Sequence, residues 1–169
     1  ARLLGQVDEA LVSLREAHAI ADAAQHPYRR ASAMYQLSVL DRATKQPERS
    51  LAGSRQAFAE AKQAGSTFFM AKAKMAESAA LEALDQPEGE LAAMQEALAI
   101  ARAAHSAVEE SLALINLADV YLRRKNFEAV DRTLAALDEV EVPREATGSR
   151  KMLPIVAAGA PPFVQNVVT

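Results

Sequence analysis

The chain lacks cysteine and tryptophan and has few aromatic residues. Without cysteine it cannot form disulfides, bind a metal through thiolates or use a catalytic thiol, and the redox compartment stays undetermined. Eight Phe and Tyr residues stand against 38 alanines among 169 residues. The apolar half of the chain therefore consists mostly of small side chains, which favours closely packed helices and excludes an all-β barrel or sandwich.

The chain also lacks a strong net charge and a long apolar run. A net charge of -3, from 19 basic and 22 acidic residues, gives no electrostatic basis for a nucleic-acid partner or for binding to an anionic membrane. The sequence contains no run of about 18 apolar residues, so it predicts no transmembrane helix. No signal peptide is visible either, because Asp8 and Glu9 come too early. We therefore expect a cytoplasmic globular protein.

The residue types that usually carry catalysis are scattered along the chain. His18 and His26 are eight positions apart, a spacing that does not place two ligands on one helix face, and no acidic cluster converges on either. The six glycines occur singly, so no phosphate-binding loop can be built from them. No serine lies in a Gly-x-Ser-x-Gly turn. The sequence predicts no enzymatic activity, no cofactor and no metal site.

Comparison of the sequence with itself shows a repeat at an offset of 40 residues. The clearest columns contain Val7, Pro47, Pro87 and Phe127, and then Leu11, Leu51 and Leu91. We expect the three leucines to be equivalent buried residues. Each repeat holds two helical patterns, because apolar residues recur three and four positions apart on either side of a break.

The helix boundaries follow from these patterns. Helices of a first type are expected at residues 28–45, 67–84 and 107–125, and helices of a second type at 7–25, 47–64, 87–104 and 127–140. Residues 1–5 are interpreted as the last turn of a preceding helix. Gly65 fits a helix C-cap, and Ser106 with Glu109 fits a capping box. Such pairs bury their apolar faces only against neighbours, so the sequence predicts an all-α, right-handed superhelical solenoid of antiparallel helix pairs.

Residues 1–142 resemble the tetratricopeptide repeat family. The resemblance is carried by residues at the spacing of that family, namely Leu114, Leu117, Ala118, Tyr121, Asn126, Phe127 and Leu134. The period of 40, against about 34 in most members, is similar to the variety found in bacterial regulatory and signalling proteins. The chain would then hold a partial repeat at 1–27 and repeats at 28–66, 67–106 and 107–142. Lys74 and Glu77 occupy columns that otherwise predict core, so the helix at 67–84 is expected to be rotated or shifted in register.

The resemblance also implies a binding surface. In the family the first helix of each pair lines a concave groove. By position, three rows would line it here: Tyr35, Met75 and Ile115; Val39, Ala79 and Asp119; and Arg42, Glu82 and Leu122. Some members hold the terminal carboxylate of a peptide through Lys and Asn side chains in such rows. Those residue types are absent from these rows, and Asn116 falls one position away, so we do not expect a carboxylate clamp.

Residues 143–169 break the 40-residue rhythm. No charged side chain occurs from Met152 onward, and several prolines prevent one continuous helix. The segment is interpreted as a degenerate capping helix, a docked peptide or a cloning remnant. Its expected anchors are Leu153, Ile155, Val156, Phe163 and Val164. They would pack against the predicted groove or against the last repeat around Leu134 and Leu137.

These observations favour a protein-interaction module or scaffold. We expect it to be part of a larger bacterial regulatory or signalling protein and to bind a protein or peptide partner in an apolar concave groove. The first alternative is a homo-oligomerisation module, because an open-ended solenoid exposes apolar helix faces that can pair with a second copy. The second alternative is a small-ligand sensor that holds its ligand between helix pairs.

Overall fold

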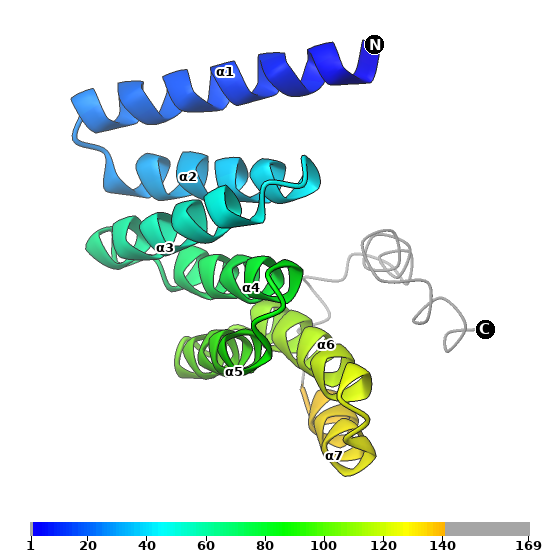
Figure 1. Cartoon of the computed structure of the whole chain (residues 1–169). Coiled ribbons are helices and arrows are strands. Elements are labelled where there is room, and N and C mark those ends of the chain that lie inside the picture. Colours follow the sequence, from blue (N-terminus) through cyan, green and yellow to red (C-terminus); the bar gives the residue numbers. More distant parts are fainter. Residues whose placement is uncertain (1, 141–169) are drawn as a thin grey trace.

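The computed structural model describes residues 2–140 of the chain, with side chains from residue 7 onward. This part is entirely α-helical and contains no strand. Its seven helices run from α1 at the top of Figure 1 to α7 at the bottom, with α5 and α6 side by side. They are α1 (Arg2–Ala23), α2 (Pro27–Ala43), α3 (Pro47–Gln63), α4 (Thr67–Ala83), α5 (Pro87–Ala103), α6 (Ala107–Arg123) and α7 (Phe127–Asp138). Within these residues, no helix combines the length and the apolar character needed to cross a bilayer.

The helices follow a 20-residue rhythm that divides each predicted repeat in two. From α2 to α6 each helix has 17 residues, and three residues connect each helix to the next. Pro27, Pro47 and Pro87 begin helices, where the missing N–H leaves no hydrogen bond unmade. Pro27 therefore starts α2 as well as following α1. Connections this short require successive helices to be antiparallel.

Every connection is closed in the same way. The second connecting residue has a positive φ, and the N–H of the third bonds to a carbonyl five residues back, as in Ser66 to Ala61 (2.9 Å). This pattern is the Schellman motif, which usually requires glycine. Gly65 supplies it once with φ +64°, whereas the equivalent positions hold Gln25, Lys45, Asp85, His105 and Lys125. The repeated closure fixes the angle between consecutive helices along the whole stack.

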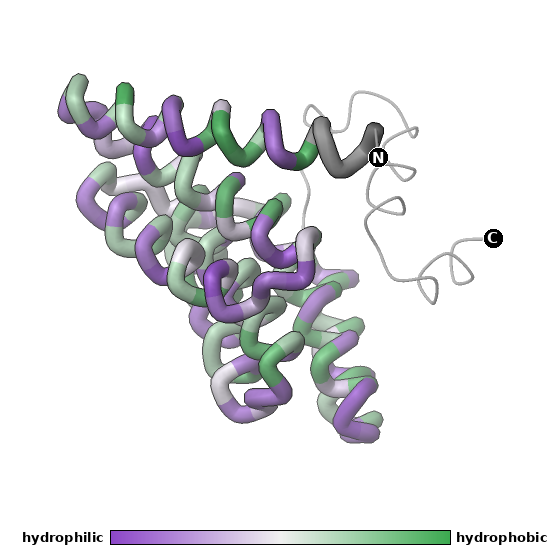
Figure 2. The backbone as a smooth tube through the Cα atoms, turned by 45° about the horizontal axis from the view of Figure 1, so that its top comes forward, coloured by the Kyte–Doolittle hydropathy of each residue, from purple (hydrophilic) through white to green (hydrophobic). Residues whose placement is uncertain are grey.

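The helices form two layers. Besides packing on their chain neighbours, α2 packs on α4 and α4 packs on α6, so these three helices form an inner layer. The helices α1, α3, α5 and α7 alternate with them as the outer layer. Figure 2 shows hydrophobic and hydrophilic residues interleaved along each helix, as expected for helices that each bury one side. The described residues thus form an all-α helical-repeat solenoid of antiparallel pairs.

Small side chains bring the two layers into close contact. Ala57 and Ala61 in α3 and Ala71 and Ala73 in α4 are fully buried. Larger side chains fill the space between α5 and α6, where Met94, Leu98, Leu114 and Leu117 form a buried cluster with Ala113. Of the predicted leucine column, Leu11 is buried, whereas Leu51 and Leu91 are half-buried. In α3 the buried places near Leu51 belong to Ser50 and Ser54, so the expected equivalence of the three leucines is wrong.

The expected rotation of the helix at 67–84 does not occur. Glu77 is 6% exposed and occupies the same buried column as Leu37 and Leu117. Lys74 Nζ lies 2.9 Å from Glu77 Oε2 and 2.9 Å from Glu96 Oε2 in α5, so the charges enter the core as a network. The register is kept because these ion pairs satisfy the buried polar atoms.

Two local expectations at helix starts also differ. Residues 2–5 continue into α1 and do not end an earlier helix. The Ser106 hydroxyl donates a hydrogen bond to the Glu109 carboxylate and makes no bond to the helix backbone, so the capping box does not form. The segment 143–169, with its expected anchors, lies outside the described residues.

Candidate functional site

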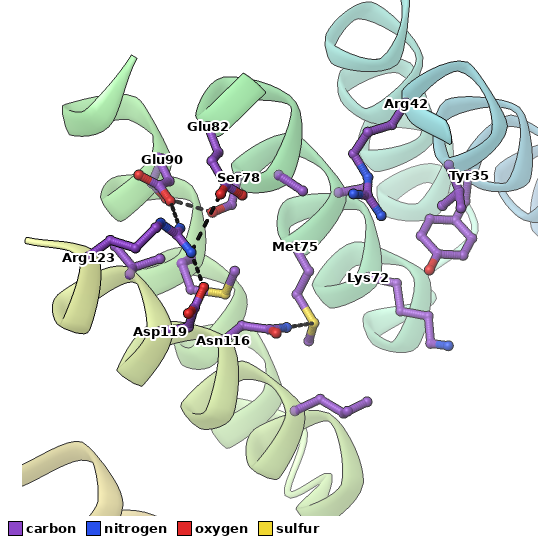
Figure 3. Close-up of a pocket in the computed structure, with 16 residues that line it drawn as sticks. Tyr35, Arg42, Lys72, Met75, Ser78, Glu82, Glu90, Asn116, Asp119 and Arg123 are labelled. Atoms are coloured by element: carbon purple, nitrogen blue, oxygen red, sulfur yellow. Dashed lines mark hydrogen bonds and ion pairs between the residues drawn. The ribbon is translucent and has the colours of Figure 1, made fainter. Parts of the chain in front are cut away.

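The inner layer carries a concavity of about 730 Å³ between α2, α4 and α6. Of the nine residues predicted to line a groove, seven border it, namely Tyr35, Val39, Arg42, Met75, Ala79, Glu82 and Asp119. Figure 3 shows them around one hollow, with Met75 between the Tyr35 side and the Asp119 side. Helical spacing and the offset of 40 thus bring together residues from three repeats.

Ile115 and Leu122 do not line the concavity. In α6 the lining residues are instead Leu112, Asn116, Asp119, Val120 and Arg123. One step along a helix turns the side chain by about 100°, so the step from Ile115 to Asn116 changes which face is presented. The face of α6 that meets the hollow is the one turned toward α4.

Lys72 is a lining residue that sequence reasoning missed. It lies one turn before Met75 on α4, and Leu112 occupies the equivalent place on α6. The helical spacing of the predicted rows, extended by one turn toward the start of each helix, indicates both residues.

The floor of the concavity is apolar and adaptable. Met94 is buried beneath it, while Met75 and Ala79 on α4 are half-buried. The Asn116 amide nitrogen lies 3.9 Å from the Met75 sulfur and is the polar group in the middle of the hollow in Figure 3. Methionine fills irregular spaces and tolerates changes of its neighbours. Such a floor can accept apolar side chains of more than one shape.

One end of the concavity is rich in carboxylates. Arg123 contacts three acidic side chains, pairing with Glu90 and Asp119 and lying 3.5 Å from Glu82 Oε1. The Ser78 hydroxyl donates a hydrogen bond to the Glu90 backbone oxygen (2.9 Å), which ties α4 to the start of α5. One guanidinium among three carboxylates leaves this end with an excess of negative charge.

The opposite end carries cations and an aromatic ring. Arg42 and Lys72 both line the hollow there, and neither forms an ion pair with any residue from 7 to 140. Lys72 Nζ lies 5.8 Å from the centre of the Tyr35 ring and 4.7 Å from that of Phe68. Burial raises the pKa of the Tyr35 hydroxyl, and the positive charge of Arg42 partly offsets this rise. Tyr35 is therefore a neutral hydrogen-bonding group at neutral pH.

An aromatic cluster continues from this end. The Phe69 ring centre lies 5.1 Å from that of Tyr28, 6.1 Å from that of Tyr35 and 5.0 Å from that of Phe68. Phe69 is buried, whereas Tyr28 and Phe68 are exposed. These four residues are half of the eight Phe and Tyr residues in the chain. The exposed members extend the apolar surface beyond the concavity along the starts of α2 and α4.

The histidines do not converge on the concavity. His18 Nε2 lies 2.9 Å from Glu60 Oε1, and Arg30 shares the same carboxylate at 3.4 Å. These contacts join α1, α2 and α3 and lie outside the lining of the concavity. Between residues 7 and 140, no group of three or more His, Asp or Glu side chains is arranged to hold a metal ion. The lining of the concavity instead combines apolar side chains with charged groups at its two ends.

Comparison with known proteins does not identify this chain. No model of a known protein family matches it, and no match is found among curated proteins. The resemblance to the tetratricopeptide repeat therefore stays a prediction from the residues.

Proposed function

We propose that this chain is a protein-interaction module, similar to a tetratricopeptide repeat domain, that binds an extended or helical peptide segment of a partner in the concavity of its inner layer. The observation that carries the proposal is the hollow of about 730 Å³ lined from α2, α4 and α6, with Met75 at its centre and charged side chains at both ends. Apolar pockets with a few fixed polar groups are the usual form of a peptide-binding groove.

The chemistry of the lining supports a side-chain ligand. Met75, Val39 and Ala79 offer apolar contact, while Asn116 and Tyr35 offer hydrogen bonds at separate places. A peptide segment supplies apolar and polar groups in alternation, so it can satisfy both sets at once. The lining comes from three consecutive inner helices. Binding would therefore depend on the stacking of the repeats.

The test measures peptide capture by variants that fill the hollow. A displayed library of random 12-residue peptides is selected on the chain, and the enriched peptides are synthesised. Ala79→Glu places a charged side chain on the floor and should weaken their binding at least tenfold, as should Met75→Glu. Ala52→Glu is the matched control, because Ala52 is exposed on α3 and lies outside the concavity.

Circular dichroism must show unchanged helicity in the variants that are compared. Met75 packs against the α5–α6 core cluster, so Met75→Glu can disturb folding, and Ala79→Glu then decides the question. Equal binding by Ala79→Glu and Ala52→Glu would show that the hollow is not the binding surface.

Self-association is a second candidate function, favoured by apolar side chains at the two ends of the stack. Val12 and Ile20 on α1 are 61% and 63% exposed, and Phe127 and Leu134 on α7 are 62% and 46% exposed. Exposed apolar residues at solenoid ends can pair with a second copy. Light scattering over a range of concentrations tests this function, and a Val12→Glu/Ile20→Glu variant should remove any association made through α1.

A further inference from the structure

We propose that the concavity binds its partner segment in one direction, with an acidic side chain of the segment at Arg42 and Lys72, an apolar side chain over Met75, and a basic side chain at Glu82 and Asp119. This inference rests on the proposed function and adds the charge order of the segment to it. Figure 3 shows the groups that carry it, with Arg42 and Lys72 on one side of Met75 and the carboxylates on the other.

The charges that line the hollow balance in number but not in place. Three basic side chains, Arg42, Lys72 and Arg123, face three acidic ones, Glu82, Glu90 and Asp119. All three acidic side chains contact Arg123. The carboxylate end therefore has an excess of two negative charges, and the other end has two positive charges with no ion pair among residues 7–140.

The carboxylates differ in their access to a ligand. The Glu90 side chain is only 8% exposed and is held by Arg123, whereas the Glu82 side chain is 49% exposed and that of Asp119 is 34% exposed. Glu90 thus serves to position Arg123. Glu82 and Asp119 keep oxygen atoms that a basic side chain of the segment can reach.

Aromatic rings hold one of the two cations at the basic end, Lys72, whereas Arg42 is exposed. Lys72 is half-buried, and its ammonium group lies over the rings of Tyr35 and Phe68. Contact with the ring faces holds the ammonium group beside Tyr35 even without a carboxylate partner. Arg42 follows Tyr35 by two helical turns on the same face of α2. Together they present two cations beside a neutral Tyr35 hydroxyl that can donate to a carboxylate.

A groove with opposite charges at its ends discriminates between the two directions of a segment. In the favoured direction each end of the segment meets an opposite charge, whereas in the reverse direction both ends meet like charges. Lys72 and Asp119 are half-buried, so their part of the difference is screened less than at a free surface, whereas Arg42 and Glu82 are exposed. The apolar floor supplies attraction in both directions, but Asn116 and Tyr35 offer hydrogen bonds at two separate and unlike places. A segment whose charges are exchanged therefore cannot bind equally well by reversing.

The experiment uses the displayed library of random 12-residue peptides and the full chain. We expect the enriched peptides to share one order of charges, with an acidic and a basic residue on opposite sides of an apolar one. Exchange of the two charged residues within a peptide should weaken its binding at least tenfold. The loss should shrink in high salt, because added ions screen both ends.

A double-mutant cycle then assigns the acidic residue to its place. Arg42→Glu/Lys72→Glu should weaken binding of the original peptide at least tenfold. The same variant should bind well to a peptide whose acidic residue is replaced by lysine. The milder Arg42→Gln/Lys72→Gln variant is the check if the first one does not fold. It should weaken binding of the original peptide and reduce its advantage over the charge-exchanged form, because only the carboxylate end then discriminates between them.

The outcomes separate the two proposals. If the enriched peptides bind equally well after charge exchange, but Ala79→Glu abolishes their binding, the directional inference is wrong and the groove remains the binding site. The same holds if the peptides show no common charge order. If no peptide is enriched above the level seen with Ala79→Glu, both proposals are wrong.

Discussion

Lys74 and Glu77 form a 2.9 Å ion pair inside the repeat core, in the columns that Leu114 and Leu117 occupy one repeat later. Arg55 from α3 donates a second hydrogen bond to Glu77 (2.8 Å), and Glu96 from α5 accepts one from Lys74. The side chain of Lys74 also lies over the Phe58 ring, at 4.6 Å from its centre. One charged cluster thus joins α3, α4 and α5, where its neighbours use hydrophobic contacts.

The first prediction concerns the energy of this pair. Glu77→Ala should lower the free energy of unfolding by about 3 kcal/mol, because it leaves the ammonium group of Lys74 with one carboxylate fewer in a mostly buried place. Lys74→Met/Glu77→Leu should be about as stable as the original chain or more stable, because it restores the hydrophobic column. Urea denaturation measures both variants. A double variant less stable than Glu77→Ala would contradict the prediction.

The second prediction is a pH dependence of stability that comes from Glu77. Burial raises its pKa, but the hydrogen bonds from Arg55 and Lys74 outweigh this effect and leave the pKa below its ordinary value of 4.5. A carboxyl group with a lower pKa in the folded state stabilises the fold above its unfolded pKa. That stabilisation is lost as the pH falls through the folded value.

The corresponding measurement compares Glu77→Gln with the original chain as a function of pH. The gap in unfolding free energy should be largest from about pH 5 to 8 and should shrink below about pH 4.5. Glu128→Gln is the matched control, because Glu128 forms only an exposed pair with Arg132 at 3.6 Å; it should change stability by about 0.5 kcal/mol at most. A gap for Glu77→Gln that stays constant down to pH 3 would refute the assignment.

The third prediction concerns Lys74. Burial lowers the pKa of Lys74, but its hydrogen bonds to Glu96 and Glu77 raise the pKa by more than burial lowers it, so this pKa lies above 10.5. A basic group with a raised pKa stabilises the fold below its unfolded value, and this contribution is lost as the pH rises through the folded one. The original chain should therefore lose stability above about pH 10.5, and Lys74→Met should not show this loss. Thermal unfolding between pH 9 and 11 measures it, and an identical alkaline slope in both proteins would contradict the expectation.

The helix boundaries could be predicted from sequence, whereas the buried charges could not. Prolines at the first helical position and a constant offset indicate the helix starts. For each helix from α2 to α7, the predicted ends lie within two residues of the observed ones. The polar character of Lys74 and Glu77 predicts that both side chains are exposed. It does not show that Arg55 and Glu96, which lie on other helices, pair with them in the core. Burial of a charge depends on such distant partners, which a local pattern does not contain.

The candidate site was predictable to a similar degree. The family resemblance gave the rows on α2 and α4, but on α6 the hollow meets Asn116 instead of Ile115. Which face of a helix borders a hollow depends on how neighbouring helices turn around one another. That turn is set by packing along the stack and not by the sequence of α6 alone.

The fourth prediction concerns the repeated helix closure. Lys45 has a φ of 59°, a left-handed conformation that costs a side-chain-bearing residue roughly 1 kcal/mol relative to glycine. Lys45→Gly should therefore raise the free energy of unfolding by up to about 1 kcal/mol. Ala59→Gly is the matched control, because Ala59 is exposed within α3 and the same replacement there should cost about 1 kcal/mol. Opposite signs for the two variants in urea denaturation are the expected result, and equal losses would contradict it.

The last prediction contrasts two glycines inside helices. Alanine is favoured over glycine by about 1 kcal/mol within a helix, so the sign depends on what the added methyl group meets. At Gly53 in α3 a Cβ would lie 3.2 Å from the Cβ of Ser38 and 3.4 Å from its Cα, atoms that move only with the backbone of α2. At Gly89 in α5 it would lie 3.2 Å from Cδ1 of Leu81, the end of a side chain that can rotate away. Gly89→Ala should therefore be neutral or stabilising by about 0.5 kcal/mol, whereas Gly53→Ala should destabilise by about 1 to 2 kcal/mol through forced separation of α2 and α3. Thermal unfolding of the two variants side by side measures the difference. If Gly53→Ala is at least as stable as Gly89→Ala, α2 and α3 do not pack as closely at Gly53 and Ser38 as this prediction requires.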